Sequence, residues 1–412
     1  MRLILRLGYL AIPLAFVVHD VLAGHFPPGL RRWEPLITFL LSGYAVVPLA
    51  HLMGEATAQL AERTGPTWGG LLNATFGNAA ELIIAIIALT KGLNGVVKSS
   101  LTGSILGNLL LVSGGAMLVG GWKRERQAFS KATAQTNSAL LAVAVVGLLF
   151  PAIFDWTFQK ADTHLAMHET RVSIGTAIVL LTVYGLGLLF TLRTHRHVFT
   201  PTPPQGPEDP VGLSTGESWS VFKSVAALFI ASLLTAAVSE LLVGSVEPVA
   251  QSMGWNPIFV AIILLATFGN AAEHSTALLL AGRNDMDTAM TITYQSSLQI
   301  ALFVTPFLVL LSAVVSPFAG KVEQLDLIFS PMEVAAVLLS VGVVIVVGLN
   351  GETNWFEGVL LLAVYAILGI TFFYIPMGHG GGYDKEDAGA ARHGRAVEVR
   401  RQPQGLMHVT AQ

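Results

Sequence analysis

Apolar segments follow one another along almost the whole chain, and each is close to the ~20 residues that a helix needs to cross a bilayer. Only 12% of the residues are charged, whereas a soluble globular domain carries roughly 25%. The sequence contains no cysteine, which excludes disulfides and thiolate metal sites, and no basic patch that would bind nucleic acid. We therefore predict an all-α, polytopic membrane protein in contact with the lipid bilayer. Eleven transmembrane helices are expected, near residues 4–23, 33–60, 67–90, 99–121, 135–153, 171–192, 219–243, 256–281, 287–315, 330–349 and 356–375.

The first apolar segment has the length of a signal-peptide core, and a small-residue cleavage site follows it at Ala23. Pro13, His19 and Asp20 fit such a core poorly. We therefore expect this segment to be retained as the first transmembrane helix.

One eight-residue sequence occurs twice. Ala-Thr-Phe-Gly-Asn-Ala-Ala-Glu occupies residues 74–81 and recurs at 266–273, 192 positions later. The similarity continues at the same offset, where Ser104 corresponds to Ser296, each 23 residues after the glutamate of its motif. Each half then has five spans, and this odd number gives the two halves opposite orientations in the bilayer. Inverted repeats of this kind are typical of secondary transporters, whose binding site lies between the repeats near the midplane.

The predicted plan is one helix followed by two sets of five. Residues 1–31 contain the first transmembrane helix, 32–192 the first inverted repeat and 219–376 the second. A proline-rich linker at 193–218 joins the repeats, and the polar, glycine-rich tail at 377–412 is predicted to be disordered.

The distribution of lysine and arginine predicts the orientation of the chain. These residues are somewhat more numerous in the loops on the side of the N-terminus and the linker. We therefore expect the N-terminus to be cytoplasmic and the C-terminus to be outside. No organellar targeting segment is evident, which favours the cell (inner) membrane over a vacuolar one.

Glu81 and Glu273 stand alone as acidic residues within two apolar spans. A charge at the centre of a membrane helix costs about 2.5–3.5 kcal/mol on insertion scales, so such residues usually have a function. Two neighbouring glutamates can hold either one divalent cation or two protons. The empty, doubly charged site would be too costly to bury during a conformational switch, which favours exchange over uniport. The alternative is a pair of protonated glutamates with a structural role.

The residues around the glutamates suit a hard cation. Ca2+ takes about six to eight oxygen ligands, and two carboxylates supply at most about four. Asn78 and Asn270 each lie three residues before their glutamate and so share its helix face. Supporting roles are predicted for glycines that allow backbone carbonyls to approach, for hydroxyl residues and for one histidine: Gly77, Gly269, Thr75, Thr267, Ser104, Ser296 and His274.

Several of these residues have a second interpretation. Gly77 and Gly269 could serve helix packing alone, and Ser104 and Ser296 could form hydrogen bonds between helices without touching the ion. His274 could tune or relay protons or simply fill a helix interface. In the first span of each half, Glu55 and Glu240 could attract cations at the two entrances or pair locally at helix ends.

At these motifs the chain resembles the Ca2+/H+ antiporters, the cation/proton exchanger branch of the cation/Ca2+ exchanger superfamily. Gly-Asn-Ala-x-Glu in both halves, here at 77–81 and 269–273, is typical of that branch. The resemblance extends over about residues 33–375. It implies a 1 + 5 + 5 arrangement of eleven helices, with Glu81 and Glu273 as the transport carboxylates. The linker lacks the acidic stretch that the family often has there.

The leading hypothesis is a secondary transporter that exchanges Ca2+ for protons, with Ca2+ as substrate and no resident cofactor. A Na+, K+ or Mn2+/proton antiporter on the same scaffold is the alternative, because the number of ligands and the cavity size cannot be seen in a sequence. A metal-dependent intramembrane hydrolase is a distant alternative, since no His-Glu-x-x-His motif lies within a span. Homo-oligomers are compatible with the sequence.

Overall fold

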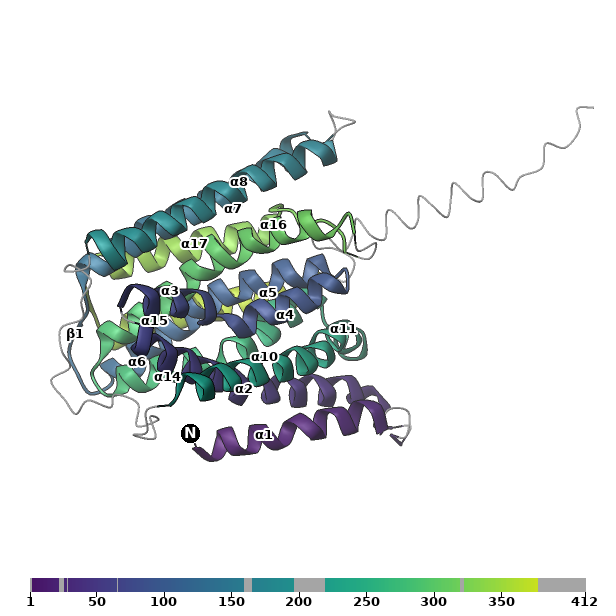
Figure 1. The fold of residues 1–412 in the computed structure, drawn as a ribbon. Coiled ribbons are helices and arrows are strands. Elements are labelled where there is room, and N and C mark those ends of the chain that lie inside the picture. The colour runs from purple at the N-terminus through teal and green to yellow at the C-terminus, as the bar shows by residue number, and fades with distance from the viewer. Residues whose placement is uncertain are drawn as a thin grey trace, which may run out of the picture.

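Long helices that lie side by side along a common axis make up nearly all of the molecule (Figure 1). The computed structural model describes residues 2–21, 26–27, 29–64, 66–158, 165–195, 219–318 and 322–376. Most of the linker predicted at 193–218 and the whole tail predicted at 377–412 lie outside the described residues. The helices of the first half are α1 (Arg2–Phe16) with η1 (Val17–Val21), η2 (Arg31–Trp33), α2 (Glu34–Thr64), α3 (Pro66–Phe76), α4 (Ala79–Thr90), α5 (Asn94–Leu106), η3 (Gly107–Val112), α6 (Ser113–Gly121), α7 (Lys131–Phe158) and α8 (Leu165–Leu189) with η4 (Phe190–Thr194).

The second half contains the same succession of a long helix, a broken helix and a third helix with a π-helical stretch. Its helices are α10 (Val221–Gly244), α11 (Val246–Met253), α12 (Pro257–Phe259), η5 (Val260–Leu265), α13 (Ala266–Gly269), α14 (Ala271–Gly282), α15 (Met286–Gln299), η6 (Ile300–Val304), α16 (Thr305–Val315), α17 (Pro331–Gly348) and α18 (Trp355–Phe373).

The predicted class, an all-helical polytopic membrane protein, is confirmed. Among the described residues, eight helices are long and apolar enough to cross a membrane. A ninth span results if Pro257–Gly269 and Ala271–Gly282, which meet at an angle of 64°, are counted as one. Strand structure within the described ranges is confined to a two-residue ladder.

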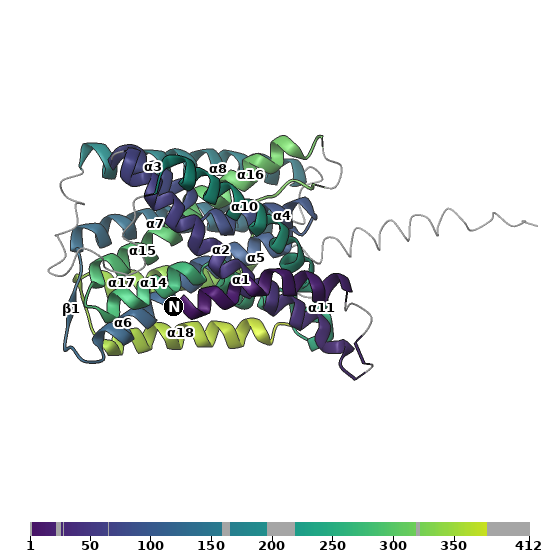
Figure 2. The ribbon, with the colours of Figure 1, turned by 60° about the horizontal axis from the view of Figure 1, so that its bottom comes forward.

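The first helix of each half packs along its counterpart from the other half. α2 lies against α10, and both contact the half-helix α4. α1 packs on α2 at the lower edge in Figure 1, and α18 packs on α6 at the lower edge in Figure 2. The half-helices α4, α13 and α14 therefore lie inside the bundle, whereas α3 packs on α2 and exposes Trp68 and Leu71.

Two loops from different halves are joined at one end of the bundle. β1 (Gln127–Ala128) pairs antiparallel with β2 (Glu352–Thr353). The backbone N–H of Phe129 extends the ladder by donating to Gly351 O at 2.9 Å. Because backbone hydrogen bonds are directional, this short ladder fixes the register of the two loops.

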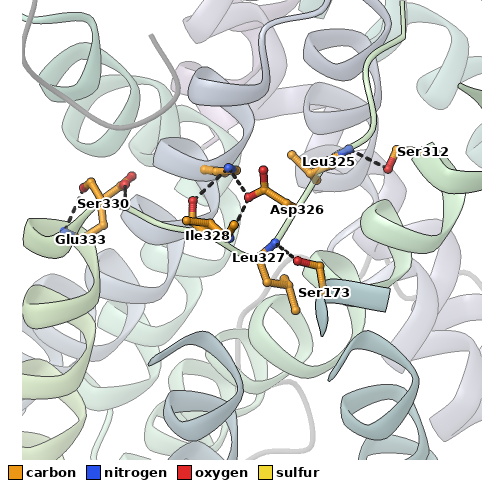
Figure 3. Close-up of polar contacts among 9 residues, drawn as sticks. Ser173, Ser312, Leu325, Asp326, Leu327, Ile328, Ser330 and Glu333 are labelled. Atoms are coloured by element: carbon orange, nitrogen blue, oxygen red, sulfur yellow. Dashed lines mark hydrogen bonds and ion pairs between the residues drawn. The ribbon is translucent and has the colours of Figure 1, made fainter. Parts of the chain in front are cut away.

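An extended segment, residues 322–330, is held against three helices at the other end of the bundle (Figure 3). Ser312 and Ser173 accept hydrogen bonds from the backbone N–H groups of Leu325 and Leu327, at 2.9 and 3.0 Å. The amine of Lys98, on α5, lies 2.5 Å from the Asp326 carboxylate and donates to Ile328 O at 2.9 Å. Side chains thus satisfy backbone groups that a segment without secondary structure cannot pair internally.

The Lys98–Asp326 ion pair should stabilise the fold measurably. The Lys98 side chain is only 10% exposed, so Asp326→Asn would leave a nearly buried ammonium without its counter-charge. We expect a loss of about 1–3 kcal/mol, below the cost of breaking a fully buried pair. Thermal unfolding of the detergent-solubilised protein would measure it.

The exposed Arg126–Glu352 pair, 3.1 Å apart, supplies the matched control. Glu352→Gln should change stability by less than about 0.5 kcal/mol, because surface pairs contribute little. Equal effects of the two substitutions would contradict the proposed difference in burial.

Candidate functional site

Both copies of the repeated motif interrupt a helix at the glycine–asparagine step. α3 ends at Phe76 and α4 begins at Ala79, while α13 ends at Gly269 and α14 begins at Ala271. Asn78 and Asn270, which separate these helices, depart from helical backbone angles, with ψ at 32° and 3°. Glycine is about 1 kcal/mol less favourable than alanine within a helix, and asparagine prefers the position just before one. The motif therefore encodes its own break.

The break places each motif glutamate near the start of a new helix. Glu81 is the third residue of α4, and Glu273 is the third residue of α14. The N-terminus of a helix carries a partial positive charge, which favours a carboxylate in the first turn. Half-helices whose N-termini face an intramembrane site are a recurrent feature of transporters built from inverted repeats.

The two glutamates face one cavity of about 570 Å³. Glu81 is 8% exposed, and Glu273 is half-buried. Both carboxyl groups border the same space. Glu81 also packs on the other motif, because its Cγ lies 3.5 Å from the point that a Cβ on Gly269 would occupy. The structure thus brings the two copies of the motif together around a shared space, which Gly77 and Ser296 also line.

A stripe of polar residues on α2 extends this cavity to the surface. His51, Glu55, Gln59 and Glu62 all line it, and their spacing places them on one face of the helix. Glu62 is exposed, whereas the first three are half-buried. The cavity therefore reaches from Glu81 to the end of α2 that leads into α3.

Each motif asparagine forms a hydrogen bond with a serine from the opposite half. Ser296, on α15, donates to Asn78 Oδ1 at 3.1 Å. Asn270 Nδ2 donates to Ser104 Oγ, on α5, at 2.8 Å. Because Ser104 and Ser296 are equivalent positions of the repeat, the two contacts are related by the same pseudo-symmetry. Neither asparagine side chain caps its own helix.

Several predicted residues lie away from the cavity lining. Thr75 donates to Leu71 O at 2.9 Å, and Thr267 donates to Ile263 O at 2.5 Å, so both hydroxyls bond within their own helices. Asn78, Asn270 and Ser104 are buried behind the cavity wall. His274 is buried too, and its ring lies against Gly107: a Cβ there would be 3.8 Å from His274 Cε1.

Glu240 lies in a second cavity, of about 600 Å³, and not in the one that contains Glu55. Its carboxylate is 3.5 Å from the amine of Lys91, which follows the C-terminal end of α4. Glu81 is at the opposite end of the same helix. The two carboxylates predicted at entrances therefore belong to different ends of the bundle, and Glu240 also has the local ion partner that the sequence allowed.

Two glutamines in the lining were not recognised as site residues in the sequence. Gln295 and Gln299 lie on α15 one turn apart, and Gln299 Oε1 accepts a hydrogen bond from Asn78 Nδ2. Both offer the amide oxygens that Ca2+ accepts as ligands. Their position within an apolar span was the signal that could have identified them. Among the described residues, no three histidine or acidic side chains gather as a metal site, so the hydrolase alternative gains no support.

Comparison with known proteins covers both halves. The sodium/calcium exchanger protein family model matches residues 34–193 and 223–374. The chain is 40% identical to a Ca2+/H+ antiporter of Synechocystis over 373 residues, which are 88% of this chain and 95% of the relative. It is 39% identical to a vacuolar calcium ion transporter of Schizosaccharomyces pombe, over 90% of this chain and 86% of the relative.

A solved structure has the same fold. The native form of YfkE, a Ca2+/H+ antiporter protein, superimposes with a TM-score of 0.71 at 34% identity, over 90% of this chain and 100% of that one. Together these similarities show that the chain belongs to the sodium/calcium exchanger protein family, among its Ca2+/H+ antiporters, and is a membrane transporter, not an enzyme.

Proposed function

We propose that the chain exchanges Ca2+ for protons by alternating access, with Glu81 and Glu273 as the carboxylates that bind either substrate. The observation that carries this proposal is that one cavity contains both glutamates, each in the first turn of a half-helix from a different half. The Synechocystis protein and another relative that is 40% identical to this chain are named Ca2+/H+ antiporters. These names support Ca2+ as the cation.

The charge of the site explains why the two substrates exchange. Two carboxylates that interact in a buried cavity are costly to keep ionised together. One Ca2+ or two protons neutralises them, and only then can the site pass through a closed intermediate. The N-termini of α4 and α14 offset part of the cost while the site awaits its next substrate. An empty carrier therefore does not cycle, and transport in one direction requires transport in the other.

Additional oxygens would complete the Ca2+ shell. Ser296, Gln295 and Gln299 border the same cavity as the glutamates, and water can enter along α2. Asn78 and Asn270 support the site from behind, where their amides connect the helix breaks to Ser296 and Ser104.

We further propose eleven spans in the arrangement 1 + 5 + 5, with the boundaries predicted from the sequence. The spans beyond the nine already described are α1 with η1 and the broken pair α3–α4. α1 runs alongside α2, and α3–α4 is interrupted at the same motif position as α13–α14 (Figure 1). The opposite directions of α2 and α10 support inverted repeats.

In this topology the N-terminus and the linker at 193–218 are cytoplasmic and the C-terminus is outside. The glutamate cavity opens at the end of α2, on the side where α1 begins, so the present conformation faces the cytoplasm. We place the protein in the cell (inner) membrane, although the relative from S. pombe is named for the vacuole. Assembly into homo-oligomers is compatible with the many exposed apolar side chains on the outer helices.

Removing either carboxylate charge should abolish exchange. Glu81→Gln and Glu273→Gln each leave a site that one Ca2+ or two protons no longer neutralises. We expect 45Ca2+ uptake into proteoliposomes with an imposed proton gradient to fall to the level of protein-free liposomes. Glu352→Gln, which changes an exposed carboxylate, should retain wild-type uptake. Uptake that persisted in either site variant would contradict the proposal.

Protons should compete with Ca2+ for the same oxygens. As the pH falls, the Ca2+ concentration that gives half-maximal uptake should rise, because bound protons must leave first. The limit for two protons is about a hundredfold per pH unit. Uptake measured at several symmetrical pH values with a fixed driving force would give this slope. A half-saturating concentration independent of pH would show that protons use another site.

The competing cations distinguish Ca2+ from the alternative substrates. Na+, K+ and Mn2+ should inhibit 45Ca2+ uptake only at concentrations well above that of Ca2+, because a pair of carboxylates favours a divalent cation over a monovalent one and Ca2+ accepts a larger, less regular oxygen shell than smaller divalent cations. Inhibition by Na+ or K+ at the concentration of Ca2+ would favour the monovalent antiporter.

A further inference from the structure

One buried asparagine joins the two serine–asparagine contacts of the site. Asn108 is fully buried in the π-helical stretch η3. Its side-chain amide donates to Ser296 Oγ at 2.8 Å and to Asn270 Oδ1 at 3.1 Å. Both amide protons are thereby used, one in each of the two serine–asparagine contacts. Asn108 does not border the glutamate cavity, so in this conformation it touches partners of the site and not the cation.

The hydrogen bonds around Asn108 have a defined direction. Asn270 Nδ2 donates to Ala266 O at 2.9 Å, and since a carbonyl only accepts, this contact fixes the orientation of the amide. Asn270 Oδ1 must then face Asn108. On the other arm, Ser296 Oγ accepts a hydrogen bond from Asn108 and donates one to Asn78 Oδ1. Asn78 Nδ2 in turn donates to Gln299 Oε1. Both arms therefore begin at the Asn108 amide.

The repeat does not supply this residue twice. At the offset of 192 that relates the two motifs, Asn108 corresponds to Ile300, the first residue of η6. The Asn78–Ser296 and Asn270–Ser104 contacts are both products of the duplication, but the link between them comes from the first half alone. Two contacts that the repeat relates to each other are thus connected by a residue that the repeat does not duplicate.

We propose that Asn108 is a positioning residue that couples the two motif copies, so that Glu81 and Glu273 act as one site. This inference rests on the proposed role of the two glutamates. Through Asn270 and Ser104, Asn108 determines how the break before α14 is held. Through Ser296 and Asn78 it does the same for the break before α4. Without Asn108, each motif asparagine keeps its hydrogen bond to a serine of the opposite half, but the two contacts are no longer joined to each other.

A double-mutant cycle repeated in two backgrounds tests the coupling. Ser104→Ala and Ser296→Ala each cut one arm, and the half-saturating Ca2+ concentration for uptake is measured for both single variants and the double variant. With Asn108 present, the effect of the double variant should differ from the product of the single effects by about twofold or more. With Asn108→Leu, which has a similar volume and no donor, the effects should multiply.

The controls separate coupling from loss of structure. Ser113→Ala removes a buried hydroxyl that donates to the backbone carbonyl of Asn108 and lies 3.0 Å from the Thr293 hydroxyl, outside the two arms, and should leave Ca2+ dependence unchanged. If Asn108→Leu fails to fold, the cycle in the wild-type background still decides. Independent effects of the two serine variants there, or coupling that survives Asn108→Leu, would overturn the proposal. Absence of proton-driven uptake by the wild-type protein would instead refute the proposed function.

Discussion

The cost of placing two carboxylates within an apolar bundle determines the rest of this structure. A continuous helix would present Glu81 and Glu273 to neighbours with no compensating charge. Breaking each helix just before its glutamate creates two N-termini whose free N–H groups and partial positive charge face the site. The same breaks disrupt backbone hydrogen bonding inside the bundle, and buried polar side chains must support them. The chemistry of the site and the irregularity of the fold therefore have one origin.

Much of that support comes from side chains of the opposite half. In a soluble protein, an asparagine in this position commonly caps the helix that follows. Here Asn78 and Asn270 instead contact Ser296 and Ser104 of the opposite half. Each half supplies the glutamate and the break, and the other half holds them in place. Neither repeat could form a complete site alone, which explains why the glycine–asparagine–alanine–alanine–glutamate sequence is identical in both.

Features that depend on neighbouring residues could be predicted from the sequence, whereas features that depend on contacts between distant parts of the chain could not. Helix positions and the weakness at Gly77 and Gly269 are local properties, visible as apolar length and poor helix propensity. The bonds of Thr75 and Thr267 could not be anticipated, because a helical hydroxyl either faces the site or bonds to its own preceding turn, depending on packing. The place of Gln295 and Gln299 in the cavity lining could not be predicted, because it depends on how α15 packs against the motif.

The polar stripe on α2 also affects how quickly the site can fill. Glu55 and Glu62 lie along a cleft whose remaining walls are largely apolar, with Glu81 at its inner end. A channel of low dielectric lined by one sign of charge concentrates the field and raises the local density of counter-ions. If Ca2+ binds at the two glutamates as we propose, it is thereby enriched at the mouth of the cleft before it reaches any ligand. Since the Debye length is about 8 Å at physiological ionic strength, this capture acts mainly within the cleft itself.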